Sequence, residues 1–310
     1  MDSLASRITA APRAHDAERG VAVAAAVGAT GVASDLIAGA AGSSPYLARL
    51  CERHAEWLAD ALDTAPETVV TGLLDALQAG QGQRETATLL RQAKARAALL
   101  IALADLGGVW PLNRITGALS DLADRCLDVA CDEVMLAETS GPLAGRSAQE
   151  AGLVALGMGK LGARELNYSS DIDLICLFDE TKWNPPDFAE VKARFITVVR
   201  RLVKLIGEVT ADGYVFRTDL RLRPNPATTP VCIAMAAAEQ YYESVGRTWE
   251  RAAFIKARPC AGDLVAGARF IEALQPFVYR RHLDFAAIED AHDMRLKIRA
   301  HKGVGHRFEV

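Results

Sequence analysis

Apolar residues recur with the period of a helix through the first half of the chain. Ser44 and Pro45, a pair typical of a helix N-terminus, precede one amphipathic segment. The same spacing predicts further helices over residues 66–79, 84–106 and 112–137. No repeat of solenoid period is present. We therefore expect residues 1–145 to form a helical N-terminal region.

The pattern changes near residue 150. Two short apolar runs, residues 151–156 and 172–178, are typical of buried strands, and a glycine-rich turn lies between them. After Asn184 and Pro185, an apolar stripe of period 3.6 predicts a long helix that ends before Asp212. Two strands, a turn and a helix in this order indicate a compact domain that differs from the helical region before it.

Residues 214–224, YVFRTDLRLRP, alternate apolar and polar side chains and predict a third strand. Its polar face would carry Asp219 among three arginines: Arg217, Arg221 and Arg223. We expect the strands to form a mixed sheet, which gives an α+β domain over residues 150–262. Residues 263–310 are expected to begin a further helical domain, with the chain truncated inside it.

Composition and charge exclude several classes of protein. The 310 residues carry a formal net charge of −4, which argues against a protein that binds nucleic acid through bulk positive charge. No apolar segment has the length and composition of a membrane span. The six cysteines show no zinc-ligand spacing, so we expect reduced, structural thiols in a cytoplasmic protein.

Two carboxylates stand where a buried strand normally has apolar residues. Asp171 and Asp173 are two positions apart, so both would project from one face of the strand, about 7 Å apart. Repulsion between them would raise their pKa values unless a cation lay between them. Oxygen ligands suit Mg²⁺, and Asp219 on a neighbouring strand would allow two ions. An exposed acid pair on an edge strand is the structural alternative.

The turn between the first two strands carries groups that could hold a phosphate. Gly157 and Gly159 would let the backbone approach a ligand, and Lys160, Ser169 and Ser170 would supply a charge and two hydroxyl groups. GMGKLG alone is a weak signal, because it is neither GxGxxG nor a P-loop. On the third strand, Arg221 and Arg223 would add positive charge.

The order of these features is more specific than any one of them. A strand, a glycine turn, a Ser-Ser pair, an Asp-x-Asp strand, a long helix and an Asp-bearing strand follow one another along the chain. This is the order expected of a DNA polymerase β-like nucleotidyltransferase domain. Such a site displaces a group at a nucleotide α-phosphorus with the help of two metal ions.

Three blocks of the sequence resemble one family. GMGKLGARELNYSSDIDLICLF, GYVFRTDLRLRP and GRTWERAAFIKARP are similar to signature blocks of bacterial glutamine synthetase adenylyltransferase, also called the adenylyl-removing enzyme. Members of that family are longer and carry two nucleotidyltransferase domains. The helical region before the site, and the third block at residues 246–259, resemble the N-terminal, adenylyl-removing half.

The resemblance implies an enzyme that removes AMP from a tyrosine of glutamine synthetase by phosphorolysis and releases ADP. It implies Asp171, Asp173 and Asp219 as catalytic metal ligands, with Mg²⁺ as the cofactor. The implied nucleotide and phosphate ligands are Gly157, Gly159, Lys160, Ser169, Ser170, Arg221 and Arg223, with Lys160 and Arg223 placed near phosphate on charge alone. Adenylylated glutamine synthetase, ATP or ADP, phosphate, a PII-type signalling protein and glutamine are the implied partners and regulators.

Two departures from the family and two alternatives stay open. NPATTP follows RLRP where many relatives have a glycine-containing loop, and the chain ends before a later glycine-rich block. The alternatives are nucleotidyl transfer from ATP to a protein tyrosine or a small hydroxyl acceptor, and a catalytically incomplete interaction fragment. On an amphipathic helix, Trp249 is expected in the core and Glu250 and Arg251 at its rim.

Overall fold

The computed structural model describes residues 2–279, 292 and 295–296. Contacts divide the chain into two compact units whose segments alternate along the sequence. We call them the helical unit and the sheet unit and describe each by itself. The helical unit comprises Met1–Gly145, Arg164–Asp171 and Arg200–Thr218. The sheet unit comprises Arg146–Ala163, Ile172–Val199 and the described residues from Asp219 onward.

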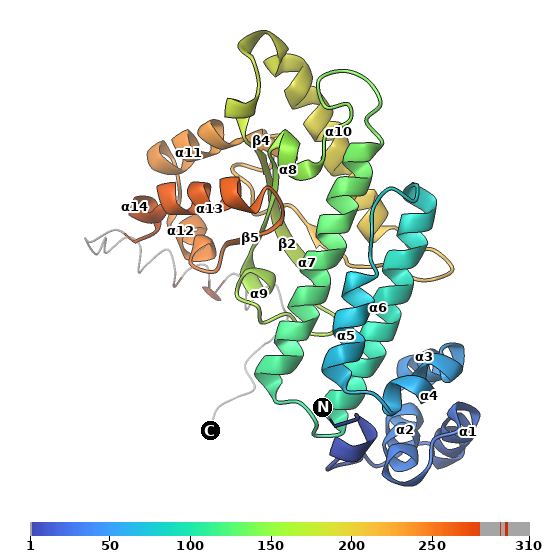
Figure 1. Ribbon diagram of the computed structural model, residues 1–310. Coiled ribbons are helices and arrows are strands. Elements are labelled where there is room, and N and C mark those ends of the chain that lie inside the picture. The colour runs from blue at the N-terminus through green and yellow to red at the C-terminus, as the bar shows by residue number, and fades with distance from the viewer. Residues whose placement is uncertain (1, 280–291, 293–294, 297–310) are drawn as a thin grey trace. The chain divides into compact units, whose positions relative to one another are not determined.

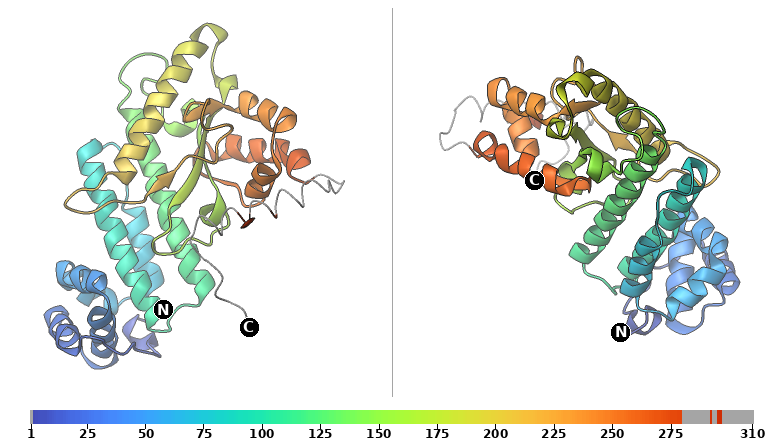
Figure 2. Two further views of the ribbon diagram at one scale, coloured as in Figure 1. Left: turned by 180° about the vertical axis from the view of Figure 1, so that it is seen from behind. Right: turned by 45° about the horizontal axis from the view of Figure 1, so that its top comes forward.

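The described part of the helical unit contains helices α1 to α7, after a short 3₁₀ turn, and the last part of α10 (Phe188–Gly207). Helices α6 and α7 are long and run side by side, with α5 next to them and α1 to α4 grouped beside α6 (Figures 1 and 2). Their bounds are α1 (Ala17–Val27), α2 (Gly31–Ser43), α3 (Pro45–Arg53), α4 (Ala55–Leu62), α5 (Pro66–Asp75), α6 (Gln83–Leu106) and α7 (Leu112–Leu136).

Local sequence explains how these helices begin and how the unit is tied together. The Ser44 side chain accepts a hydrogen bond from the backbone N–H of Leu47, which confirms the predicted N-cap of α3. The buried guanidinium of Arg91 on α6 donates to the carbonyl oxygens of Gly213 at 2.9 Å and Glu208 at 2.6 Å. These bonds hold the segment after α10 (Phe188–Gly207) against α6.

The sheet unit contains five strands and the helices that cover them. The strand order is β3-β2-β1-β5, and β4 pairs with β2. The pairs β1–β2 and β1–β5 are antiparallel and β2–β4 is parallel, so the sheet is mixed. The strands are β1 (Leu153–Gly157), β2 (Ile172–Phe178), β3 (Thr218–Asp219), β4 (Cys232–Ala234) and β5 (Arg258–Gly262). The helices are α8 (Ala148–Ala151), α9 (Gly159–Gly162), the first part of α10, α11 (Met235–Ser244), α12 (Thr248–Phe254), α13 (Leu264–Ala273) and α14 (Gln275–Val278).

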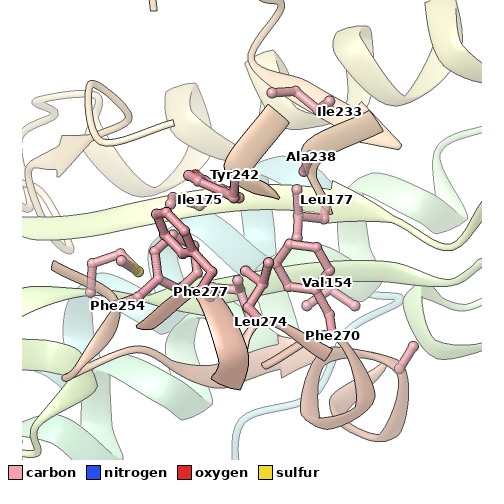
Figure 3. Close-up of a cluster of buried hydrophobic side chains, with 13 residues drawn as sticks. Val154, Ile175, Leu177, Ile233, Ala238, Tyr242, Phe254, Phe270, Leu274 and Phe277 are labelled. Carbon is pink, nitrogen blue, oxygen red and sulfur yellow. The ribbon is translucent and has the colours of Figure 1, made fainter. Parts of the chain in front are cut away.

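Both faces of the central strands are covered, which explains their nearly continuous apolar sequences. On one face, Val154 of β1 and Ile175 of β2 pack with aromatic side chains of the C-terminal helices, among them Tyr242 and Phe277 (Figure 3). On the other face, Phe178 stacks on Phe195 of α10 at 4.8 Å between ring centroids. The predicted α+β class with a mixed sheet and flanking helices is therefore confirmed.

Several predicted elements are shifted or absent. The first strand begins at Leu153 rather than at residue 151, because Ser147 and Glu150 form a capping box that starts α8. The predicted strand over residues 214–224 is largely wrong: only Thr218–Asp219 is strand, and Val215 and Phe216 are both buried instead of alternating. Strands β4 and β5 were not predicted, because each is short and neither alternates.

Two further expectations concern the cysteines and the membrane. All six cysteines are buried and none forms a disulfide. Among the described residues, no helix combines the length and the apolar character that a membrane crossing requires. Most of the predicted helical region over residues 263–310 lies outside the described residues.

Candidate active site

The glycine turn after β1 lies directly against Asp173. The backbone N–H of Met158 donates to the carbonyl oxygen of Asp173 at 2.9 Å, and α9 begins at Gly159. Gly159 has φ +54°, and a Cβ atom there would lie 3.0 Å from Oδ2 of Asp173. Glycine is therefore required twice, for the left-handed backbone and for the space beside the carboxylate.

Asp173 is the one residue of β2 that is not fully buried. Because side chains alternate along a strand, it shares a face with Ile175 and Leu177, which belong to the apolar cluster of Figure 3. The sheet register thus places a carboxylate at the end of a packed apolar face. In the sheet unit the glycine turn and this carboxylate therefore lie side by side.

Asp219 reaches the same sheet from β3, the neighbour of β2. Its carboxylate accepts bonds from Nε of Arg221 at 2.8 and 3.0 Å and from the Arg221 backbone N–H at 2.8 Å. Hydrogen bonds from Arg221 lower the pKa of Asp219 although burial opposes them. The Arg221 side chain is 84% exposed, whereas the side chain of Asp219 is only 17% exposed.

Asp171 does not lie on the strand, contrary to the prediction, because β2 begins one residue later at Ile172. It belongs to the helical unit and is exposed. Nε of Arg217 donates to its carboxylate, while other Arg217 nitrogens donate to the Ser169 carbonyl at 2.6 Å and the Tyr214 hydroxyl at 2.9 Å. The bond to Asp171 raises the pKa of Arg217.

The sequence had given Arg217 no role in the site. Only its position on the predicted polar face, beside Asp219, marked it out. In the helical unit it holds both the Ser169 carbonyl and the Asp171 carboxylate, so it orders the segment that carries the Ser-Ser pair. Arg217 therefore joins the candidate site as a positioning residue.

Residues 164–171, which we call the serine segment, are anchored to the long helices of the helical unit. The Tyr168 hydroxyl donates to Asp105 of α6 at 2.9 Å, and Arg164 pairs with Asp121 of α7. Burial and the bond to Asp105 raise the pKa of Tyr168. Within the segment, the Ser170 hydroxyl donates to the Asn167 side chain and Ser169 is exposed.

The predicted phosphate ligands Lys160 and Arg223 differ in their surroundings. Lys160 is exposed on α9. Arg223 donates to the carbonyl oxygens of Leu220 at 2.8 Å and Pro226 at 2.8 Å, and to that of Thr229 at 3.3 Å. Arg223 thus holds its own turn together. Gly157 lies at the end of β1, where an added Cβ atom would lie 3.0 Å from Cγ of Leu161.

The donor chemistry of the acids fits Mg²⁺. Asp173 and Asp219 supply carboxylate oxygens from neighbouring strands, and the absence of a side chain at Gly159 keeps space open beside Asp173. Among the described residues, no group of three or more His, Cys, Asp or Glu side chains is gathered in the geometry of a metal site. Asp171 and Asp219 are each paired with an arginine instead.

The expectation that Glu250 lies at a helix rim is wrong. Glu250 is 2% exposed and accepts bonds from the Tyr241 hydroxyl at 3.1 Å and the Arg247 backbone N–H at 2.8 Å. Its burial raises its pKa. Trp249 is half-buried, and Arg251 donates to the Phe277 carbonyl at 3.1 Å. The third block thus contains the whole of α12, and these contacts attach it to α11 and α14.

Comparison with known proteins points to one family. The family model of glutamate-ammonia ligase adenylyltransferase matches residues 34–273. The chain is 45% identical over 285 residues to the bifunctional glutamine synthetase adenylyltransferase/adenylyl-removing enzyme of Rhodopseudomonas palustris, covering 86% of this chain and 29% of that protein.

Proteins of the same description from other bacteria are similarly close. Identity is 45% over 297 residues for Bradyrhizobium sp. strain BTAi1, which covers 91% of this chain and 30% of the relative. It is 43% over 283 residues for Brucella suis, which covers 88% and 29%. The chain therefore spans about 30% of the length of the curated relatives that it matches.

Proposed function

This chain belongs to the glutamate-ammonia ligase adenylyltransferase family, and from that membership we propose that it removes AMP from adenylylated glutamine synthetase. The relatives are named for both adenylyl transfer and adenylyl removal. One observation carries the catalytic part of the proposal: Asp173 and Asp219 come from neighbouring strands, and Asp173 lies against the glycine turn. The domain is proposed to be of the DNA polymerase β-like type.

The proposed reaction is a phosphorolysis. An oxygen of hydrogen phosphate attacks the α-phosphorus of adenylyl-tyrosine, and a new P–O bond forms as the bond from phosphorus to the tyrosine oxygen breaks. The tyrosine oxygen takes the proton of the hydrogen phosphate. The products are ADP and unmodified tyrosine, so charge and atoms balance without an oxidant or a reductant.

In this proposal Asp171, Asp173 and Asp219 hold Mg²⁺. Bound Mg²⁺, two ions in the proposal, would stabilise charge on the attacking and leaving oxygens. Asp219 becomes a ligand when the exposed Arg221 guanidinium turns away from it toward a substrate phosphate. Arg217 holds the Asp171 carboxylate and the serine segment in fixed positions relative to each other.

The remaining predicted residues contact the nucleotide or phosphate in this proposal. Gly157 and Gly159 let the backbone of the turn approach the nucleotide, and the hydroxyl groups of Ser169 and Ser170 bind phosphate oxygens. Lys160 and Arg223 add positive charge. Because Arg223 already bonds to three carbonyl oxygens, it contributes chiefly by fixing the turn that follows Asp219.

Partners and location follow from the family and are proposals for this chain. Adenylylated glutamine synthetase is the proposed protein substrate, in the regulation of nitrogen assimilation. A PII-type signalling protein and glutamine are proposed regulators of the longer relatives. ATP or ADP and phosphate are the small ligands, and the cytoplasm is the proposed location.

A second candidate is AMP transfer from ATP to a tyrosine of the same protein, because the names of the relatives cover that activity too. Transfer to a small hydroxyl acceptor, and a fragment that only binds its partner, are weaker alternatives. The first alternative consumes ATP and needs no phosphate. Phosphate dependence therefore separates it from removal.

The test uses the 310-residue chain with adenylylated glutamine synthetase, Mg²⁺ and phosphate. We expect phosphate-dependent ADP, lost in Asp173→Asn and kept in Asp35→Asn, a matched change of an exposed acid on α2. AMP transfer from ATP, without phosphate-dependent ADP, would favour the second candidate over adenylyl removal. Binding of glutamine synthetase without either reaction would support the interaction fragment.

A further inference from the structure

The helical unit contains a large cavity whose lining shares only Ser169 with the residues proposed to hold metal, nucleotide or phosphate. Its volume is about 1090 Å³, and residues of α3, α6, the serine segment and the stretch 211–214 line it. None of the three proposed metal ligands is among the lining residues. Sites for small organic molecules commonly have volumes of ~300–1,000 Å³. The cavity therefore has room for a ligand the size of a nucleotide.

Small side chains on α6 create this space. Ala95, Ala98 and Ala102 line the cavity at helical spacing, where larger residues would fill it. Leu47 and Leu50 of α3 face the same space and give it apolar walls. Arg91 also lines the cavity, and its bond to the Gly213 carbonyl at 2.9 Å holds the lining stretch 211–214 against α6, so the cavity is preformed.

One positive charge in the cavity has no anionic partner among the residues that the structure describes. The Lys94 ammonium lies 6.0 Å from the centroid of the Tyr46 ring and 5.3 Å from that of the Tyr214 ring. Within the described part of the chain, no carboxylate pairs with it and no hydrogen-bond acceptor contacts it. Burial lowers its pKa, as expected of a cation whose charge is poorly compensated.

The acids that also line the cavity do not compensate Lys94. Asp212 pairs with Arg53, and Asp105 accepts the hydroxyl hydrogen of Tyr168. Glu52 is exposed. Four cations and three acids line the cavity in all: Arg49, Arg53, Arg91 and Lys94 against Glu52, Asp105 and Asp212. The lining therefore favours a ligand with negative charge.

From this geometry we infer that the cavity binds a small organic anion. Its acidic group, a carboxylate or a phosphate, pairs with Lys94, and its flat apolar body lies against the rings of Tyr46 and Tyr214 and the alanines of α6. The inference does not depend on the proposed phosphorolysis, since none of the three proposed metal ligands lines the cavity. Its occupant would touch Tyr214, whose hydroxyl is bonded to Arg217.

Calorimetric titration of the full chain in EDTA tests this inference. The probes are AMP, which carries a phosphate, and 2-naphthoate, which carries a carboxylate; adenosine and 2-naphthamide are their uncharged counterparts. We expect saturable binding of at least one anion, and at least about tenfold weaker binding of its uncharged counterpart, because only the anion compensates the lysine charge. The stronger anion shows which acidic group the site prefers.

Two variants link the binding to the cavity. Lys94→Met removes the charge and keeps the apolar stem, and Ala95→Leu fills space while keeping the charge; each should weaken binding by at least about tenfold. Lys192→Met, at an exposed position on α10, is the matched control and should bind as the unmodified chain does. Circular dichroism checks that every variant is folded. Failure of both anions to bind, or unchanged binding by Lys94→Met and Ala95→Leu, would overturn the inference.

Discussion

Strand β2 and residues 214–229 each bring one acid to the sheet unit, yet they are held in different ways. β2 pairs with β1 over five residues and with β4 over three, and its register places Asp173 beside Gly159. The second segment has only two residues of strand, Thr218 and Asp219, followed by turns. Hydrogen bonds between backbones position the first acid, whereas arginine side chains hold the second.

The difference shows when an alternating pattern produces a strand. Residues 214–224 alternate as clearly as any strand, but Arg223 bonds to the carbonyl oxygens of Leu220, Pro226 and Thr229, and Arg221 closes a turn on Asp219. These hydrogen bonds satisfy backbone polar groups that would otherwise bond to a neighbouring strand. We therefore expect Asp173 to be fixed and Asp219 to be adjustable.

The largest expected effect is on catalysis at the fixed acid. Asp173→Asn removes a proposed metal ligand without changing side-chain size, so kcat/KM for ADP formation should fall by at least ~10²-fold. The melting temperature should stay within a few degrees of that of the unmodified chain. Retention of full activity by Asp173→Asn would show that the strand acid is not part of the site.

Gly159→Ala should weaken both folding and activity. Its Cβ would lie 3.0 Å from the Asp173 carboxylate on a backbone at φ +54°, and a left-handed conformation costs a residue with a Cβ about 1–2 kcal/mol. Gly28→Ala shares the left-handed backbone, at φ +75°, but has no atom within 4 Å of its Cβ. Chemical denaturation should show similar losses of stability for the two variants, whereas only Gly159→Ala should lose activity. Equal activities of the two variants would show that the contact between Gly159 and Asp173 does not contribute to catalysis.

The two arginines should differ in their effect on stability. Arg223→Ala leaves carbonyl oxygens of a half-buried turn without donors and should lower the free energy of unfolding by about 1 kcal/mol or more. Arg221→Ala removes a side chain that is 84% exposed and should cost about 0.5 kcal/mol or less. Urea unfolding of both variants measures the contrast. The reverse order would mean that the exposed Arg221–Asp219 pair stabilises the fold more than the Arg223 bonds to the turn do.

The smallest expected effect is on stability at acidic pH. The pKa of Asp219 is lower in the folded chain than in the unfolded one, so its stabilising contribution is complete above about pH 4 and is lost as the pH falls through the folded value. Arg221→Gln should move the pKa of Asp219 upward and move that loss to higher pH. A carboxyl ¹³C titration of the two proteins measures the shift. An unchanged pKa would show that Arg221 is not its cause.

Periodicity predicted the long helices α6 and α7 and strand β2 because their neighbours reinforce the local pattern. The bounds of α6 and α7 differ from the predicted ones by a single residue, and β2 matches residues 172–178. The sequence also indicated a glycine turn between the first two strands, and Gly159 of that turn lies beside Asp173. These features depend on residues that are close in sequence or buried together.

The missed features depend on pairings that no local pattern contains. The bond between Arg217 and Asp171 joins residues 46 positions apart, and β5 forms because Arg258–Gly262 pairs with β1. The burial of Glu250 follows from its bonds to Tyr241 and Arg247, which depend on how α11 and α12 pack. Such contacts are set by tertiary structure, so charge and spacing alone suggested an exposed rim.

The fate of inorganic phosphate tests the central claim most directly. The chain would be incubated with adenylylated glutamine synthetase, Mg²⁺ and ³²P-labelled phosphate, and the nucleotide products would be separated. We predict that the label appears in ADP, and that Asp173→Asn and Asp219→Asn abolish it while Asp35→Asn does not. Unlabelled AMP as the product, or labelled ADP from chains lacking either acid, would contradict the account.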